Sequence, residues 1–142
     1  MLSKIIYASR ASRDLAETDL RALLEVSRRN NEASRISGLL LYAEGSFLQL
    51  LEGEEAALLA TYERIRRDSR HSELRLLTQS PISRRRFADW SMGFDFADAA
   101  ALGELPGYRS AAAYPLVDAN LVRNASVAEL LLGRYAGRAP AF

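Results

Sequence analysis

Residues 36–53 read ISGLLLYAEGSFLQLLEG, and the fold can be predicted outward from them. It contains two apolar runs, 36–42 and 46–52, separated by the short link AEG. Runs of this length joined by a short link that contains glycine are typical of a β-hairpin. Gly53 interrupts the pattern directly after the second run. We therefore expect two adjacent antiparallel strands, followed by a helix.

The chain around this hairpin carries further strand and helix patterns. Leu20, Leu23 and Leu24 share one stripe of an amphipathic helix. Asn30 and Asn31 are expected to end that helix, because asparagine tolerates left-handed backbone. Residues that alternate between two faces indicate a strand near the start of the chain, and an aromatic-rich stretch indicates the last strand. The expected strands cover residues 3–9, 74–78 and 90–96, and the expected helices cover residues 17–29 and 54–67.

The resulting order is strand, helix, strand, strand, helix, strand, strand. This is the split βαβ arrangement of ferredoxin-like α+β folds, with one added fifth strand. In this arrangement the first and third strands are neighbours, and right-handed crossovers place both helices on the same face of the sheet. The opposite face must then be covered by the rest of the chain or by a partner.

The C-terminal part of the chain is expected to supply that cover. We divide the sequence into a domain at residues 1–96 and an alanine-rich helical cap or output extension at residues 97–142. Ser126 followed by Glu129 has the spacing of a capping box, which predicts a helix over residues 127–135. The run LLL inside this helix is apolar enough to dock on the sheet.

Composition excludes several classes of site. The 142 residues contain no cysteine, which excludes disulfides, thiol nucleophiles, cysteine zinc sites and iron–sulfur clusters. A single histidine, His71, excludes most two-histidine metal sites.

Charge and hydropathy also bear on partners. The net charge of +1 is unlike the basic footprint of a duplex-binding domain, and the run RRR at residues 84–86 is expected to be a solvated turn. No apolar run approaches the roughly 20 residues needed to cross a bilayer. The N-terminal stretch does not have the pattern of a signal peptide. We therefore expect a cytoplasmic protein that contacts neither nucleic acid nor membrane.

Two polar residues inside the expected strands require partners. Gln49 lies in the middle of the apolar run FLQLL, where an unpaired amide costs about 1–3 kcal/mol. Tyr7 lies in the middle of the first strand, and a buried tyrosine usually finds a partner for its hydroxyl. Because the first and third strands are neighbours, both side chains can face each other beneath the helices. Two interpretations stay open: a structural hydrogen bond, or a pair that addresses a ligand between sheet and helices.

The other polar candidates have ordinary explanations when each is taken alone. Asn30 and Asn31 at a helix end are usually caps, although two adjacent amides can also bind the carbonyl edge of a flat heteroaromatic ring. Arg64 and Asp68, four residues apart, are expected to form a surface ion pair. His71 follows in a polar loop, where a lone histidine is usually solvated.

Taken together, these residues resemble the BLUF family of blue-light sensors, which bind a flavin. The matching motifs are IIYASRASRDL at the start, RRNN followed by ISGLLLY, then GSFLQLLEG, YERIRRDSRH and PISRRRFADWSMGF. They occur in the family's order and at its spacing from residue 2 to about residue 96. The family fold agrees with the fold that periodicity predicts, whereas the flavin is implied by the resemblance alone.

The resemblance implies photochemical roles for several residues. Tyr7 matches the family's electron and proton donor. Gln49 matches the glutamine that bridges that tyrosine to the flavin ring and rearranges on illumination. Asn31 matches the asparagine that hydrogen-bonds the carbonyl edge of the ring. Trp90 and Met92 match a last-strand pair that exchange places between pocket and surface.

The resemblance also implies contacts around the ring. Leu23 and Ile65 match the apolar positions on the two helices that sandwich it, and Ser9 matches a small hydroxyl near the glutamine. The following residues match polar positions beside the ring, its pyrimidine edge and the ribityl chain: Asn30, Arg64, Asp68, Arg70 and His71.

The implied function is a photosensory module without turnover chemistry on this chain. FAD is the expected cofactor, with FMN or riboflavin as alternatives. The tail is similar to that of short-tailed members, whose partner is a separate downstream protein or a second copy of themselves, so we expect a homodimer. The residues leave two other functions open: a flavin-free interaction module, and an acylphosphatase-like hydrolase. The hydrolase would need backbone N–H groups that close around a phosphate, and the turn at residues 9–13 has no glycine to allow this.

Overall fold

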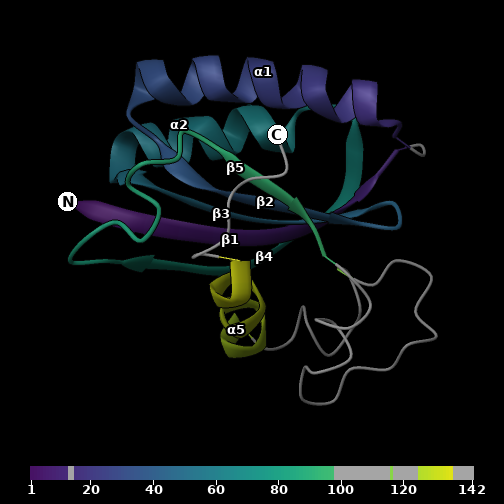
Figure 1. The fold of residues 1–142 in the computed structure, drawn as a ribbon. Coiled ribbons are helices and arrows are strands. Elements are labelled where there is room, and N and C mark those ends of the chain that lie inside the picture. Colours follow the sequence, from purple (N-terminus) through teal and green to yellow (C-terminus); the bar gives the residue numbers. More distant parts are fainter. Residues whose placement is uncertain (13–14, 98–115, 117–124, 136–142) are drawn as a thin grey trace.

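The computed structural model describes residues 1–12, 15–97, 116 and 125–135. A five-stranded sheet has the strand order β4-β1-β3-β2-β5 and carries helices on both faces (Figure 1). The strands are β1 (Leu2–Ala11), β2 (Ser37–Ala43), β3 (Ser46–Glu54), β4 (His71–Pro81) and β5 (Gly93–Phe96). The helices are α1 (Glu17–Ser34), α2 (Glu55–Arg66) and α5 (Ala125–Tyr135).

The topology confirms the predicted split βαβ sheet with a fifth strand. β1 lies antiparallel to β3, and β2 pairs with β3 through the hairpin. The turn of this hairpin places Glu44 and Gly45 in left-handed backbone, with φ of 44° and 78°, a conformation that glycine adopts without steric cost. β5 joins the other edge of β2 as a parallel strand, so it is the added fifth strand.

Helix α1 extends further than the sequence indicated. The predicted end at Asn30 and Asn31 is wrong, because the helix continues to Ser34. The left-handed residue that ends it is Arg35, with φ of 55°, whose backbone N–H bonds to the carbonyl oxygens of Asn31 and Glu32. Asn31 therefore lies inside the helix, one turn before its end.

The two edge strands also differ from the prediction in length. β4 spans His71–Pro81 where residues 74–78 were expected, because it pairs with β1 along nearly the whole of that strand. β5 is shorter than the expected 90–96. Trp90 and Met92 therefore precede the strand and lie in the segment that leads into it.

The sheet separates two hydrophobic cores. α1 and α2 cover one face and α5 lies against the other, which confirms the predicted division of the helices (Figure 1). Leu131, Leu132 and Tyr135 are buried on the α5 face, whereas Leu130 of the same apolar run is exposed. α5 begins two residues earlier than expected, so Ser126 lies in its first turn rather than at its N-cap.

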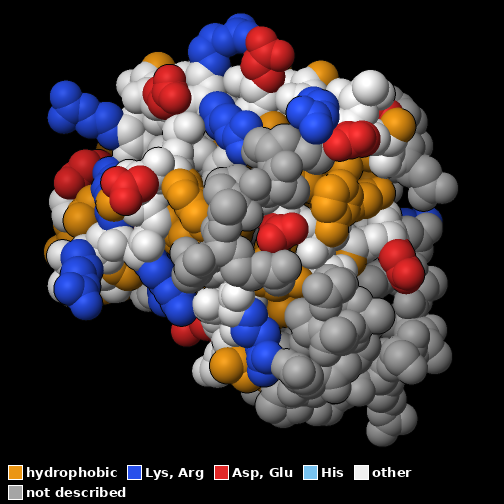
Figure 2. Space-filling model, in the orientation of Figure 1, with side chains coloured by type: hydrophobic (Ala, Val, Ile, Leu, Met, Phe, Trp, Pro, Cys, Tyr) orange, Lys and Arg blue, Asp and Glu red, His pale blue; other side chains and the backbone are white. Residues whose placement is uncertain are grey.

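Charged side chains of both signs share the surface. Lysine and arginine lie among aspartate and glutamate over the face drawn in Figure 2. Lys4 on β1 pairs with Glu129 on α5, which ties this helix to the sheet. Among the helices that the structure describes, none is long and apolar enough to cross a bilayer.

Candidate functional site

A cleft opens between α1 and α2 above the sheet. The empty space between its walls, counted together with the solvent at its mouth, is about 750 Å³. All ten residues predicted to contact a cofactor line it: Tyr7, Leu23, Asn30, Asn31, Gln49, Arg64, Ile65, Asp68, Arg70 and His71. The fold therefore brings together side chains from three strands, two helices and the α2–β4 link.

Tyr7 and Gln49 lie opposite each other in the β1–β3 ladder. The Tyr7 hydroxyl donates to Gln49 Oε1, and Gln49 Nε2 lies 3.2 Å from Met92 Sδ. All three side chains are buried. The amide of Gln49 thus connects a phenol at one end to a thioether at the other, and its rotation would change both contacts at once.

Tyr7 is held in its neutral form. Burial raises the pKa of its phenol well above the ordinary value of 10, and the neighbouring Tyr62 and Asp68 raise it further. The rings of Tyr7 and Tyr62 have their centroids 5.9 Å apart. Loss of the proton alone would leave a buried phenolate, so this phenol is suited to give up an electron and a proton together.

The two residues of the expected last-strand pair lie on opposite faces of the sheet. Met92 is buried on the cleft face, against Gln49. Trp90 packs on the α5 face, where its ring stacks on Phe87 with centroids 5.6 Å apart. The resemblance allowed either residue beside the glutamine, and the structure places Met92 there.

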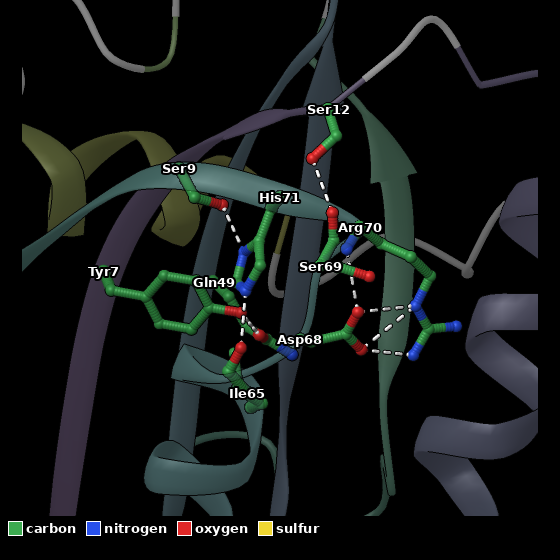
Figure 3. Close-up of polar contacts among 9 residues, drawn as sticks. All are labelled: Tyr7, Ser9, Ser12, Gln49, Ile65, Asp68, Ser69, Arg70 and His71. Carbon is green, nitrogen blue, oxygen red and sulfur yellow. Dashed lines mark hydrogen bonds and ion pairs between the residues drawn. The ribbon is translucent and has the colours of Figure 1, made fainter.

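His71 is the first residue of β4 and not a solvated loop residue. Its Nδ1 lies 2.9 Å from Ser9 Oγ, and its Nε2 lies 2.5 Å from the carbonyl oxygen of Ile65 (Figure 3). Because a carbonyl oxygen only accepts hydrogen bonds, Nε2 carries a proton and donates to it. His71 therefore joins the C-terminal end of α2 to β1, two residues from Tyr7.

Asp68 and Arg70 form an ion pair beside the cleft (Figure 3). Asp68 lies beyond the end of α2 and pairs with Arg70 instead of the expected Arg64. Its carboxylate accepts from the guanidinium Nε of Arg70 at 3.0 Å and from the backbone N–H of the same residue at 2.9 Å. The side-chain bond is the main cause that holds the pKa of the Asp68 carboxyl below its ordinary value, against the opposing effect of burial.

Two side chains of α1 hold the backbone beside Met92. Asn31 is buried, and its Nδ2 donates to the Ser91 carbonyl oxygen at 2.7 Å. Arg28, almost one turn earlier, donates from Nε to the Met92 carbonyl oxygen at 2.8 Å. Asn30 is half-buried and lines the cleft next to Asn31. The segment that carries Met92 is therefore bonded directly to the helix that forms one wall of the cleft.

Sequence reasoning missed five residues that line the cleft: Val26, Ser27, Leu40, Phe47 and Thr61. Patterns already present in the sequence point to four of them. Ser27 and Thr61 lie four residues from Leu23 and Ile65, so each shares a helical stripe with a predicted wall residue. Leu40 lies directly opposite Gln49 in the β2–β3 register, and Phe47 precedes Gln49 by two residues on the same face.

The side chains of the cleft fit a flavin. Leu23 on α1 and Ile65 on α2 supply apolar surface from opposite helices, as a flat aromatic ring system requires. The amides of Asn30, Asn31 and Gln49 offer donors and acceptors to a heteroaromatic edge. The Asp68–Arg70 ion pair offers a polar surface for a hydroxylated chain.

Comparison with known proteins identifies relatives of this chain. The family described as sensors of blue light using FAD, BLUF, matches residues 2–93. The photoactivated adenylate cyclase subunit beta of Euglena longa is 36% identical over 92 residues, which are 64% of this chain and 11% of that protein. The photoactivated adenylate cyclase subunit beta of Euglena gracilis is 34% identical over 92 residues, which are again 64% of this chain and 11% of that protein. The chain thus spans 11% of the length of these two curated relatives.

Solved structures share the fold. The ground state of BlsA superposes with a TM-score of 0.86 and 25% identity, covering 100% of this chain and 92% of that one. The dark state of BlrB, a BLUF protein, gives a TM-score of 0.65 and 33% identity, covering 68% of this chain and 73% of that one. From the family match over residues 2–93, the shared fold and the cleft between α1 and α2, we conclude that this chain belongs to the BLUF family, the sensors of blue light using FAD.

Proposed function

We propose that this chain is a blue-light photoreceptor that binds an oxidised flavin non-covalently in the cleft between α1 and α2. The observation that carries the proposal is the row of contacts from Tyr7 through Gln49 to Met92 beside that cleft. FAD is the form we propose, in keeping with the family description. FMN and riboflavin are alternatives, because the lining residues are suited mainly to the ring and the chain next to it.

Each proposed contact follows from the position of a side chain in the cleft. Leu23 and Ile65 pack on the two sides of the ring, and Asn31 bonds its carbonyl edge. Ser9 acts through His71, to which it is bonded, rather than by direct contact. The polar positions beside the ring and the ribityl chain are assigned to these residues: Asn30, Arg64, Asp68, Arg70 and His71.

The flavin, when bound, supplies the absorption of blue light and an excited state that accepts an electron. Tyr7 would supply this electron, and its hydroxyl proton would move toward Gln49 Oε1, to which it is already bonded. The return of both to Tyr7 would leave no net chemistry, with only the hydrogen bonds of Gln49 changed. The chain has no cysteine to form an adduct, which supports a small and reversible change in absorption.

We propose that the signal leaves the site through Met92. Its sulfur is the contact of Gln49 Nε2, so a rotation of the amide changes this contact first. The domain at residues 1–96 would then act on the extension at residues 97–142 and on a partner, either a separate downstream protein or a second copy of the chain. No turnover chemistry is proposed for this chain.

An absorption spectrum of the purified protein, refolded with excess flavin and recorded before and after blue light, tests the proposal. We expect a yellow protein with a small red shift that reverses in the dark. Tyr7→Phe and Gln49→Leu should each keep the flavin and abolish the shift. Tyr62→Phe is the matched control, because Tyr62 lies beside Tyr7 and is expected to leave the shift intact. A colourless wild type, or a normal shift in Tyr7→Phe, would overturn the proposal.

A further inference from the structure

Glu52 is a buried carboxylate to which the photochemistry assigns no role. It lies on the α5 face of β3 and is 2% exposed. Its two oxygens accept three hydrogen bonds, from Ser37 Oγ at 3.0 Å, from the Arg86 backbone N–H at 2.6 Å and from the Phe87 backbone N–H at 3.0 Å. Two of these donors belong to the segment between β4 and β5, which has no strand partner at this point. The carboxylate therefore binds a loop to the last part of β3, the central strand of the sheet.

Arg85, a residue of the same segment, adds bonds from its side chain to the sheet. Its Nη1 donates to Ser37 Oγ at 2.9 Å and to the Glu52 carbonyl oxygen at 3.0 Å. Its Nη2 donates to the Arg35 carbonyl oxygen at 2.7 Å. This half-buried arginine contradicts the expectation of a solvated turn at residues 84–86, because it is bonded to the ends of β2 and β3.

The segment held in this way reaches both faces of the sheet. Phe87 and Trp90 pack in the core that contains α5, and the Trp90 carbonyl oxygen accepts from the Gly38 backbone N–H at 3.0 Å. Met92, two residues further, lies against Gln49 on the cleft face. Residues 85–92 thus form a continuous connection between the glutamine and the core beneath α5.

We propose that Glu52 is a positioning residue that anchors residues 85–92, so that Met92 lies against Gln49 while Phe87 and Trp90 lie against the α5 core. The anchoring of residues 85–92 rests only on the hydrogen bonds of Glu52 and does not require a bound flavin. Its consequence for light signalling, that α5 senses Gln49 through this anchored segment, rests on the proposed function.

The chemistry of the anchor requires a carboxylate. Two adjacent backbone N–H groups and a hydroxyl all donate to Glu52, and an ionised carboxylate offers acceptors on both oxygens. Glutamine has the same shape but replaces one oxygen by an NH₂ group, which cannot accept. Glu52→Gln therefore leaves a donor at residues 86–87 without an acceptor, while the volume of the core is kept.

Trp90 is the only tryptophan of the chain, so its fluorescence reports on the segment alone. In the dark protein with flavin bound, we expect Glu52→Gln to increase quenching of Trp90 by acrylamide. The matched control is Glu54→Gln, two residues along the same strand, whose exposed carboxylate pairs with the N-terminus. Quenching of Trp90 in Glu52→Gln equal to that in Glu54→Gln and in the wild type would overturn the anchor.

Hydrogen exchange of the wild type tests the anchor without a substitution. The amides of Arg86 and Phe87 should exchange as slowly as strand amides, and Glu52→Gln should accelerate them by at least about tenfold, the factor for losing a hydrogen bond to a charged acceptor. Wild-type amides at 86 and 87 that exchange at the rate of exposed loops would overturn the proposal, even if Glu52→Gln does not fold.

Measurements of the red shift and of dark recovery after blue light separate the anchor proposal from the proposed function. Glu52→Gln should keep the initial red shift but change the rate of dark recovery, whereas Glu54→Gln should change neither. If the wild type shows no red shift, the proposed function fails while quenching and exchange still test the anchor. If the red shift is present and recovery in Glu52→Gln equals that of the wild type, the signalling role of the anchor is refuted.

Discussion

Gly93→Ala is expected to displace Trp90, because the glycine leaves room for the indole. A Cβ at residue 93 would lie 2.3 Å from Trp90 Cε3 and 2.9 Å from Cζ3. Carbon atoms in contact keep about 3.5–4.0 Å between them, so the ring must retreat by more than about 1 Å. Trp90 is stacked on Phe87, and Gly93 is paired with Leu39 in the β2–β5 ladder, so neither side moves without losing a contact.

The expected cost is that of overpacking a core, about 1–3 kcal/mol in the free energy of unfolding. Urea unfolding measures this cost, and the emission of Trp90, the only tryptophan, reports its move toward solvent. Gly133→Ala is the matched control. Its Cβ would approach only the guanidinium end of Arg86, with Nη2 at 2.6 Å, and that flexible group can move aside.

Alanine also favours a helix over glycine by up to about 1 kcal/mol, so Gly133→Ala should unfold at equal or higher urea concentration than the wild type. The reasoning is refuted if Gly93→Ala changes the free energy of unfolding by less than about 0.5 kcal/mol and leaves the Trp90 emission unchanged. In that case the indole does not occupy the space above residue 93.

Three further predictions concern the cleft. Asn31→Ala removes the donor to the Ser91 carbonyl oxygen and should lower the free energy of unfolding by about 1–3 kcal/mol while weakening flavin binding; an unchanged flavin titration would remove Asn31 from the site. Met92→Ala removes the contact of Gln49 Nε2 and should alter dark recovery but spare the initial red shift, and identical recovery kinetics would contradict this role. The pKa of Asp68 in the folded protein lies below its ordinary value of 3.8. The bonds from Arg70 therefore stabilise the folded protein in full at pH values above 3.8. This stabilisation is lost as the pH falls through the pKa that Asp68 has in the folded protein. Arg70→Gln should raise the Asp68 pKa in a carboxyl NMR titration, and an unmoved pKa would show that Arg70 is not its cause.

Local patterns in the sequence were sufficient for the sheet and for the pair at its centre. Apolar residues recur every two positions in the strands and along one stripe of α1. These patterns show which side of each element is buried, and they are visible in the sequence without knowing which element packs against that side. Once the order of elements indicated a split βαβ sheet, β1 had to lie beside β3. Tyr7 and Gln49 could therefore be placed opposite each other, and the β1–β3 register confirms it. The end of α1 was misplaced because Asn31 has its side-chain partner at Ser91, sixty residues away.

From the sequence we could predict that β1 lies beside β3, that both helices cover one face of the sheet and, through the resemblance to BLUF proteins, ten of the residues that line the cleft. Three contacts could be found only in the folded protein: Met92 rather than Trp90 lies against Gln49, His71 joins Ser9 to the end of α2, and Glu52 binds residues 86–87. The physical reason is the same in each case. Each of these contacts joins two segments that are far apart in the chain. In each case one of the segments is an irregular loop or lies beside a loop. Such a segment has no periodic pattern of apolar residues, so the sequence does not show which way its side chains point.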